Sequence, residues 1–157
     1  MPILADEITR DSPGQRALLD RLLDVLLISA LRTWFTRQRD DAPAWYQAQA
    51  DPVVGTALQL IHHHPAYPWT VALLAEKAGA SRAAFARRFT ELVGEPPMAY
   101  LTSWRLAMAA DLLCQPDMTI GAVARQVGYG TPFALSAAFK RERGVSPQEH
   151  RSFADVA

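Results

Sequence analysis

The sequence predicts an all-α fold of two tandem helix-turn-helix units joined by a long helix, with further helices at the N-terminus. The main observation is an internal repeat, in which residues 118–128 align with residues 69–79 at a constant offset of 49. Helix-capping residues and apolar residues at helical spacing recur in both copies and support the same fold. After the offset grows by one residue, the repeat continues: Phe89, Gly94 and Pro97 return as Phe139, Gly144 and Pro147.

Each copy contains the capping residues of two short helices. Thr70 and Thr119 can accept a backbone N–H at a helix start, and Gly79 and Gly128 can adopt the positive φ that ends a helix. We therefore expect helix-turn-helix units at about residues 70–93 and 119–143. The second helix of each copy has its own cap: Ser81 in the first copy, and Thr131 followed by Pro132 in the second.

Apolar spacing predicts a small core in each unit. Phe85 and Phe89 lie one helical turn apart in the first, as do Leu135 and Phe139 in the second, and both pairs should face inward. Between the copies, residues 97–114 have no internal glycine or proline and predict one long linker helix. In a helix-turn-helix unit of this kind, the second helix can lie in the DNA major groove and read it. A linker helix of this length would span about 25 Å and place these two reading helices about 34 Å apart, which is one turn of DNA. Because the copies differ, we expect an asymmetric recognition site.

These motifs resemble the DNA-binding domain of the AraC/XylS family of bacterial transcription regulators. The resemblance covers residues of about 66 to 153 and implies seven helices, of which the third and sixth read DNA. The matching positions are Leu74-Ala75, Gly79, Ser81, Phe85, Arg87, Phe89, Gly94, Pro96-Pro97, Tyr100-Leu101, Trp104-Arg105-Leu106, Ala109, Leu112-Leu113, Ile120, Val123-Ala124, Val127-Gly128-Tyr129, Phe139-Lys140-Arg141, Gly144-Val145-Ser146-Pro147 and Arg151.

The resemblance implies that the outward faces of the two reading helices bind DNA. Arg87 could fork onto guanine O6 and N7, whereas Arg88 is expected to follow the DNA backbone. The second face offers few hydrogen bonds, so we expect most sequence specificity from the first unit and mostly positioning from the second. The first face is Arg82, Ala83, Ala86 and Arg87; the second is Pro132, Phe133, Ser136 and Ala137, preceded by Thr131 and followed by the expected phosphate ligands Lys140, Arg141 and Arg143. For each of these last three cations, a solvated helix end is an equal alternative.

The sequence before residue 66 predicts an N-terminal amphipathic segment, residues 1–42, and connecting helices, residues 43–65. From Leu18 to Trp34, after a cap at Ser12-Pro13, apolar residues repeat at helical spacing over more surface than one solitary helix can hide. This helix either packs on Trp45-Tyr46 and residues 53–61, across a joint at residues 40–43, or forms a homodimer through residues 15–39.

Some family members have a cupin-type sensor domain before such a helix. Here no β-rich sensor is visible, and only its trailing helix is expected to remain. We therefore expect a truncated or stand-alone regulator in which effector binding is doubtful.

Composition gives weaker indications. The net charge is zero, and residues 69–157 hold ten Lys and Arg against eight Asp and Glu, so nonspecific affinity for DNA should be modest. No apolar run approaches a membrane span, and no signal peptide is recognisable. The single Cys114 excludes an internal disulfide, fits a cytoplasmic protein and is expected to be a small buried residue. The sequence Ser146-Pro147-Gln148-Glu149 is a capping box that should begin a last helix, with Phe153 closing the second core.

Two other classes of function compete with a DNA-binding regulator. One is a truncated regulator that acts by protein–protein interaction with a full-length relative. An enzyme is not expected, because Cys114 lies in a helix without a flanking histidine. His62-His63-His64 suggests a metal site, but consecutive histidines point around a helix, so no metal or cofactor is expected. The expected partner is double-stranded DNA, with a homodimer and RNA polymerase as further candidates and no membrane.

Overall fold

The computed structural model describes residues 14–37 and 43–154, which are helical apart from the turns between helices. The chain divides into two compact units, Met1–Tyr46 and Gln47–Ala157. No helix of the described residues is both long and apolar enough to cross a membrane. The helices are α2 (Gln15–Arg37), α3 (Ala44–Ala50), α4 (Pro52–His63), α5 (Val71–Lys77), α6 (Arg82–Val93), α7 (Pro97–Leu113), α8 (Ile120–Gln126), α9 (Pro132–Arg143) and α10 (Pro147–Ala154).

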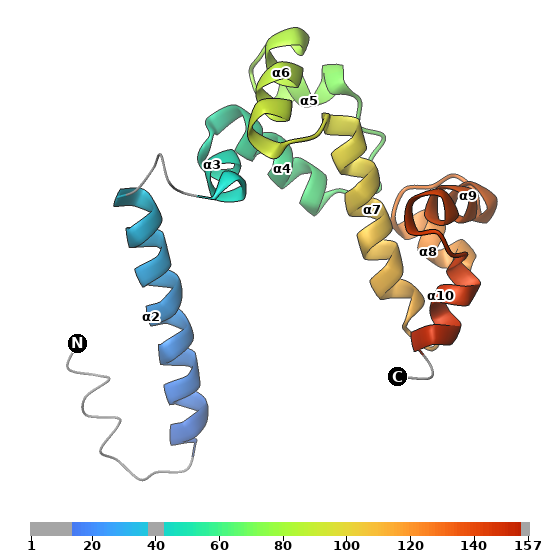
Figure 1. The fold of residues 1–157 in the computed structure, drawn as a ribbon, viewed down its shortest axis with the longest axis horizontal. Helices are drawn as coiled ribbons and strands as arrows, with labels where there is room; N and C mark the ends of the chain where they lie inside the picture. The colour runs from blue at the N-terminus through green and yellow to red at the C-terminus, as the bar shows by residue number, and fades with distance from the viewer. Residues whose placement is uncertain (1–13, 38–42, 155–157) are drawn as a thin grey trace. The chain divides into compact units, whose positions relative to one another are not determined.

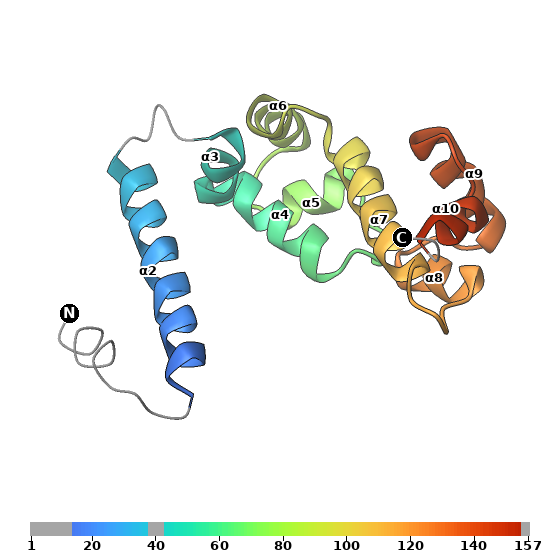
Figure 2. The same cartoon turned by 60° about the horizontal axis from the view of Figure 1, so that its bottom comes forward.

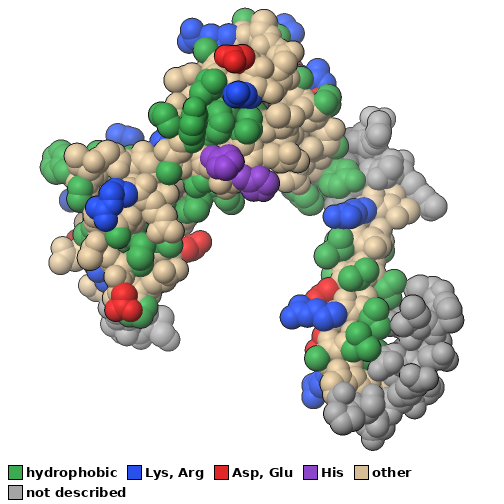
Figure 3. Space-filling model, turned by 180° about the vertical axis from the view of Figure 1, so that it is seen from behind, with side chains coloured by type: hydrophobic (Ala, Val, Ile, Leu, Met, Phe, Trp, Pro, Cys, Tyr) green, Lys and Arg blue, Asp and Glu red, His purple; other side chains and the backbone are tan. Residues whose placement is uncertain are grey.

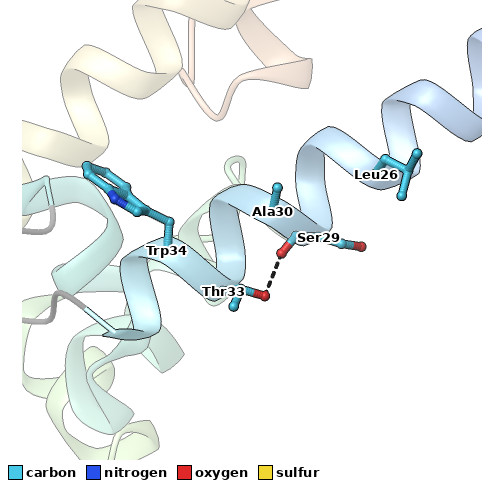
Figure 4. Close-up of a pocket in the computed structure, with 5 residues that line it drawn as sticks. All are labelled: Leu26, Ser29, Ala30, Thr33 and Trp34. Carbon is cyan, nitrogen blue, oxygen red and sulfur yellow. Dashed lines mark hydrogen bonds between the residues drawn. The ribbon is translucent and has the colours of Figure 1, made fainter.

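In the first compact unit, Met1–Tyr46, α2 is one helix of 23 residues with apolar side chains at its surface (Figure 3). Leu23, Val25 and Leu27 are each about 60% exposed. In Figure 4, Leu26, Ala30 and Trp34 line a shallow pocket at four-residue spacing beside Thr33, whose hydroxyl donates to the carbonyl of Ser29 at 2.9 Å. The predicted cap at Ser12-Pro13 lies outside the described residues.

The second compact unit, Gln47–Ala157, contains both helix-turn-helix units and two separate cores, and α7 contributes to both cores. Leu101, in its first half, is buried among residues of α4, α5 and α6, while Leu106 and Leu113 are buried among residues of α8 and α9. Figures 1 and 2 show α7 running between these two groups of helices. The long linker helix is therefore confirmed, with Cys114 as its C-cap.

The first core extends beyond the first helix-turn-helix unit. Phe85 and Phe89 are fully buried, as predicted, and their rings lie 5.6 Å apart. The helix before the repeat, α4, adds Val54 and Ile61, which are equally buried. Because burying an aliphatic side chain stabilises a fold by about 1.5–3 kcal/mol, α4 is part of what holds this unit together.

The capping residues that the repeat predicts act as expected. Gly79 and Gly128 have φ values of 70° and 85°, so each ends its helix in the left-handed conformation. Counted from α4, the described chain has the seven helices that the family resemblance implies, with α6 third and α9 sixth. The hydroxyl oxygens of Thr70, Ser81, Thr119 and Thr131 accept backbone N–H groups of Leu73, Ala84, Ala122 and Ala134 at 3.1 to 3.3 Å.

The capping box before α10 is also confirmed. The Ser146 N–H donates to Glu149 Oε2 at 2.6 Å, and the Glu149 N–H donates to Ser146 Oγ at 3.2 Å. The bond from the Ser146 backbone lowers the pKa of Glu149. The side chain of Phe153, expected to close the second core, lies outside the described side chains.

Candidate nucleic-acid interface

The outward face of α6 is open to solvent. Arg82, Ala83 and Arg87 are exposed, and Ala86 is half-buried. The Arg87 side chain keeps 77% of its surface exposed, and its Nε lies 3.7 Å from Glu91 Oε1 one turn later. Exposed pairs of this kind contribute only about 0–1 kcal/mol, so the guanidinium can leave Glu91 for another acceptor.

The outward face of α9 is more apolar. Phe133 is 82% exposed, the largest exposure among the large apolar side chains of the described residues. The Ser136 hydroxyl donates to the carbonyl of Pro132 at 2.8 Å, and the Thr131 oxygen caps the helix. The Ser136 O–H is thus already used and Ala137 has no polar group, so the Thr131 O–H, which accepts but does not donate within the cap, is the main side-chain donor left on this face for a ligand.

Electrostatically, the N-terminus of α6 and that of α9 suit an anion. Neither α6 nor α9 has an acidic residue in its first turn, so the positive end of each helix dipole is not neutralised locally. Helix N-termini with free N–H groups are common phosphate sites. In the last turn of α9, Lys140, Arg141 and Arg143 place positive charge where it also favours the dipole.

Arg88, which was expected to follow the DNA backbone, makes an ion pair within the chain. Its Nε donates to Asp51 Oδ2 at 2.7 Å, and its Nη2 donates to the same oxygen. Asp51 is buried and caps α4, where its Oδ1 accepts the N–H groups of Val53 and Val54 at 3.0 and 2.9 Å. Arg88 thus ties α6 to α4 through Asp51.

Burial and pairing act on Asp51 in opposite directions. Burial alone would raise the pKa of Asp51, but the hydrogen bonds from Arg88, Val54 and Val53 outweigh it and lower the pKa. The carboxylate is therefore more acidic in the folded chain than in the unfolded one, and the pairing stabilises the fold only while Asp51 is ionised.

Two substitutions separate the cap from the ion pair. Asp51→Ala removes both and should lower Tm by roughly 4–8 °C through the lost cap, worth about 1 kcal/mol, and further because Arg88 loses its partner. Asp51→Asn keeps an acceptor for the cap and should lose only the ion pair. Since the folded-state pKa is depressed, the stability gap between wild type and Asp51→Asn should be full above the ordinary Asp pKa of about 3.9 and close as pH falls through the folded-state value. Thermal unfolding followed by circular dichroism measures this, and a gap independent of pH would contradict the assigned ion pair.

Of the histidine run, His62 packs against α7, whereas His63 and His64 are exposed. His62 Nε2 lies 2.7 Å from the Tyr100 hydroxyl, and its ring centroid lies 4.2 Å from that of Trp104. Burial lowers the pKa of His62. Figure 3 shows histidines beside apolar side chains on one face, and the described residues contain no cluster of three or more His, Cys, Asp or Glu that could hold a metal ion.

The expectation that Cys114 is a small buried residue is wrong. The thiol is exposed, because Cys114 lies at the C-cap of α7, beyond the last helical residue, and it donates to the carbonyl of Ala110 at 3.3 Å. Its Sγ also lies 3.9 Å from His150 Nε2 of α10. A histidine therefore does neighbour Cys114 in space, although none flanks it in sequence.

The fold and these faces define a tandem helix-turn-helix protein. A helix-turn-helix domain family matches residues 74–152, and a cupin family matches residues 1–36, which include most of α2. A protein of Streptomyces antibioticus that is named as an AraC-like regulator is 41% identical over 92% of this chain and 48% of its own length. The HTH-type transcriptional regulator AlkR of Acinetobacter baylyi is 38% identical over 94% of this chain and 48% of its own. The chain thus spans about half the length of these relatives.

Solved structures support the same assignment. The DNA-binding domain of AdpA, a global transcriptional factor determined in complex with a target DNA, is 33% identical, with a TM-score of 0.61 over 66% of this chain and 92% of that one. The C-terminal domain of AraT, a response regulator of Geobacillus stearothermophilus, is 33% identical, with a TM-score of 0.63 over 66% and 86%. The chain belongs to the AraC family of transcription regulators.

Proposed function

We propose that this chain binds double-stranded DNA with α6 and α9 in two successive major-groove segments. The observation that carries the proposal is the presence of two similarly built units joined by one helix, α7, each with a second helix whose outward face is exposed. The AdpA domain, which shares one third of its aligned residues with this chain, binds DNA in its crystal structure. Regulation of transcription, rather than catalysis, is the activity that family membership supports.

The two faces divide the work according to their chemistry. Arg87 reads a base and Arg82 binds a phosphate or base near the start of α6, because their guanidinium groups are exposed there. On α9, Phe133 and Ala137 make apolar contacts, and Lys140 binds backbone phosphate. Arg88 acts indirectly, by holding α6 against α4 through Asp51.

Selection from a random DNA pool, followed by footprinting on the selected fragment, tests this function. We expect protection of two segments on successive turns of the helix, because each unit occupies one major-groove segment. Affinity should fall as salt rises, since phosphate contacts release counterions. A footprint confined to one turn would contradict two-unit binding.

The exposed apolar surface of α2 favours a second proposal, a homodimer through residues 15–39. Each Å² of apolar surface left in water costs about 25 cal/mol, so pairing of two such helices is favourable. The described part of this range ends at Arg37. The same surface could pair with the corresponding helix of a full-length relative. In that case the chain would act on its relative by protein–protein interaction. Contact with RNA polymerase and a cytoplasmic location belong to the proposal through family membership and not through geometry.

We predict that the wild-type chain is a dimer at micromolar concentration and that Leu23→Gln combined with Leu26→Gln gives a monomer. The double variant should still bind DNA, because both reading helices lie in the other compact unit. Light scattering coupled to size exclusion measures the mass. Asp20→Asn, an exposed polar change on the same helix, is the control and should remain dimeric. A monomeric wild type would refute self-association through α2.

A further inference from the structure

The turn of the second helix-turn-helix unit touches the loop that leads into the first unit. Gly128, in the turn between α8 and α9, lies against Ala66 in the loop between α4 and α5. A Cβ placed on Gly128 would lie 2.7 Å from the Ala66 Cα and 2.9 Å from the Ala66 carbonyl oxygen. Ordinary contacts begin at 3.4 Å, so a side chain at residue 128 would force two backbone segments apart.

Arg105 of α7 fixes the same loop from the other side. Its Nε donates to the carbonyl of Pro65 at 2.7 Å, and its Nη2 donates to the carbonyl of Tyr67 at 2.8 Å. The same Nη2 lies 3.0 Å from the Cβ position of Gly128. The loop, the linker helix and the turn of the second unit therefore meet at one place, the Gly128–Arg105–loop contact, formed by Pro65 to Tyr67, Arg105 and Gly128.

The equivalent glycine of the first unit shows what is particular to this contact. Gly79 has a similar positive φ, 70° against 85° for Gly128, but apart from its own chain neighbours no described residue has an atom within 4 Å of its Cβ position. The conformation of the turn alone thus explains Gly79. At residue 128 a glycine is needed for two reasons: the positive φ of the turn and the close approach of the Ala66 backbone.

From this contact we infer that Gly128 and Arg105 are positioning residues that set the orientation of α9 relative to α6, and with it the spacing of DNA segments that the protein accepts. The inference rests on the proposed function. Without the contact, α7 would be the main connection between the units, and its twist or bend would change the orientation of the second reader. DNA turns once in about 10 base pairs, so a change of one base pair in spacing also rotates the second segment by about one tenth of a turn. A rigid contact between the units makes such a change costly.

Distance measurements without DNA test the contact directly. Spin labels go on Glu91→Cys of α6 and Glu142→Cys of α9, both exposed, in a Cys114→Ser background, and pulsed electron resonance gives their distance distribution. We expect Gly128→Ala to shift or broaden the distribution and Gly79→Ala to leave it unchanged, because both strain a positive φ but only the first meets Ala66. Arg105→Lys should broaden it as well, since an ammonium group cannot reproduce the fork to two carbonyls. Circular dichroism checks that each variant is folded; identical distributions for folded Gly128→Ala and Gly79→Ala would overturn the inference.

Selection on a DNA pool with variable spacing provides the functional readout. Wild type and Gly79→Ala should prefer the same spacing, and Gly128→Ala should shift that preference or weaken it by roughly tenfold, equal to 1.4 kcal/mol. An unchanged preference in Gly128→Ala would overturn the inference and leave the proposed function intact. No DNA selected by the wild type would instead overturn the proposed function, and the spacing role with it.

Discussion

Phe139→Ala is expected to destabilise the second helix-turn-helix unit by about 3–5 kcal/mol, because the ring is fully buried and its removal leaves a cavity. The ring centroid of Phe139 lies 5.4 Å from that of His150, so the change also loosens α10. Small domains are stable by only about 5–15 kcal/mol, so this loss is a large share of the total.

Phe133→Ala is the matched control, since it makes the same chemical change on the same helix at a side chain that is 82% exposed. Substitutions at such positions usually change stability by less than about 0.5 kcal/mol. Chemical denaturation measures both, and hydrogen exchange shows where Phe139→Ala acts. Because the two cores are separate clusters, amides of α8 and α9 should lose protection before those of α4 to α6. Equal loss in both groups would mean that the two cores unfold as one.

Much of this architecture was predictable because it depends on interactions between residues that are close in the sequence. Caps such as Thr70 and Thr119 act within three residues, and the inward pair Phe85 and Phe89 depends only on helical spacing. Because the same caps and apolar positions occur in both copies of the repeat, each copy supported the prediction made for the other. The exposure of Arg87 and Phe133 on the reading helices also follows from that spacing, since each lies opposite the buried face.

Contacts between distant segments were not predictable. Asp51 and Arg88 are 37 residues apart, and Arg105 is 40 residues from Pro65, so no local pattern joins either pair. The repeat was even misleading at Gly128, because its equivalence to Gly79 suggested that a positive φ was the whole reason for the glycine. A single sequence shows which residues can turn a chain, but not which other segment will pass beside them.

Arg87→Ala is expected to relax the preference at one base position of the DNA site and to cost about 1–3 kcal/mol on the preferred sequence, because a bidentate guanidinium–guanine pair discriminates by that amount. The structure leaves the side chain available for this, with 77% of its surface exposed and a weak pair to Glu91. On fragments that already carry the wrong base at that position, the loss should be small. Arg87→Lys keeps the charge and should retain affinity better than selectivity, since an ammonium group lacks the planar fork.

Lys140→Ala provides the contrasting result. Lys140 lies exposed in the last turn of α9, where a phosphate contact would be independent of sequence. We expect its removal to weaken binding to all fragments alike and to reduce the salt slope by about one ion. Titration of the selected site and its single-base variants with wild type, Arg87→Ala, Arg87→Lys and Lys140→Ala distinguishes the two roles. Equal losses for Arg87→Ala on every fragment would show that Arg87 binds the backbone and that α6 reads the base through other residues.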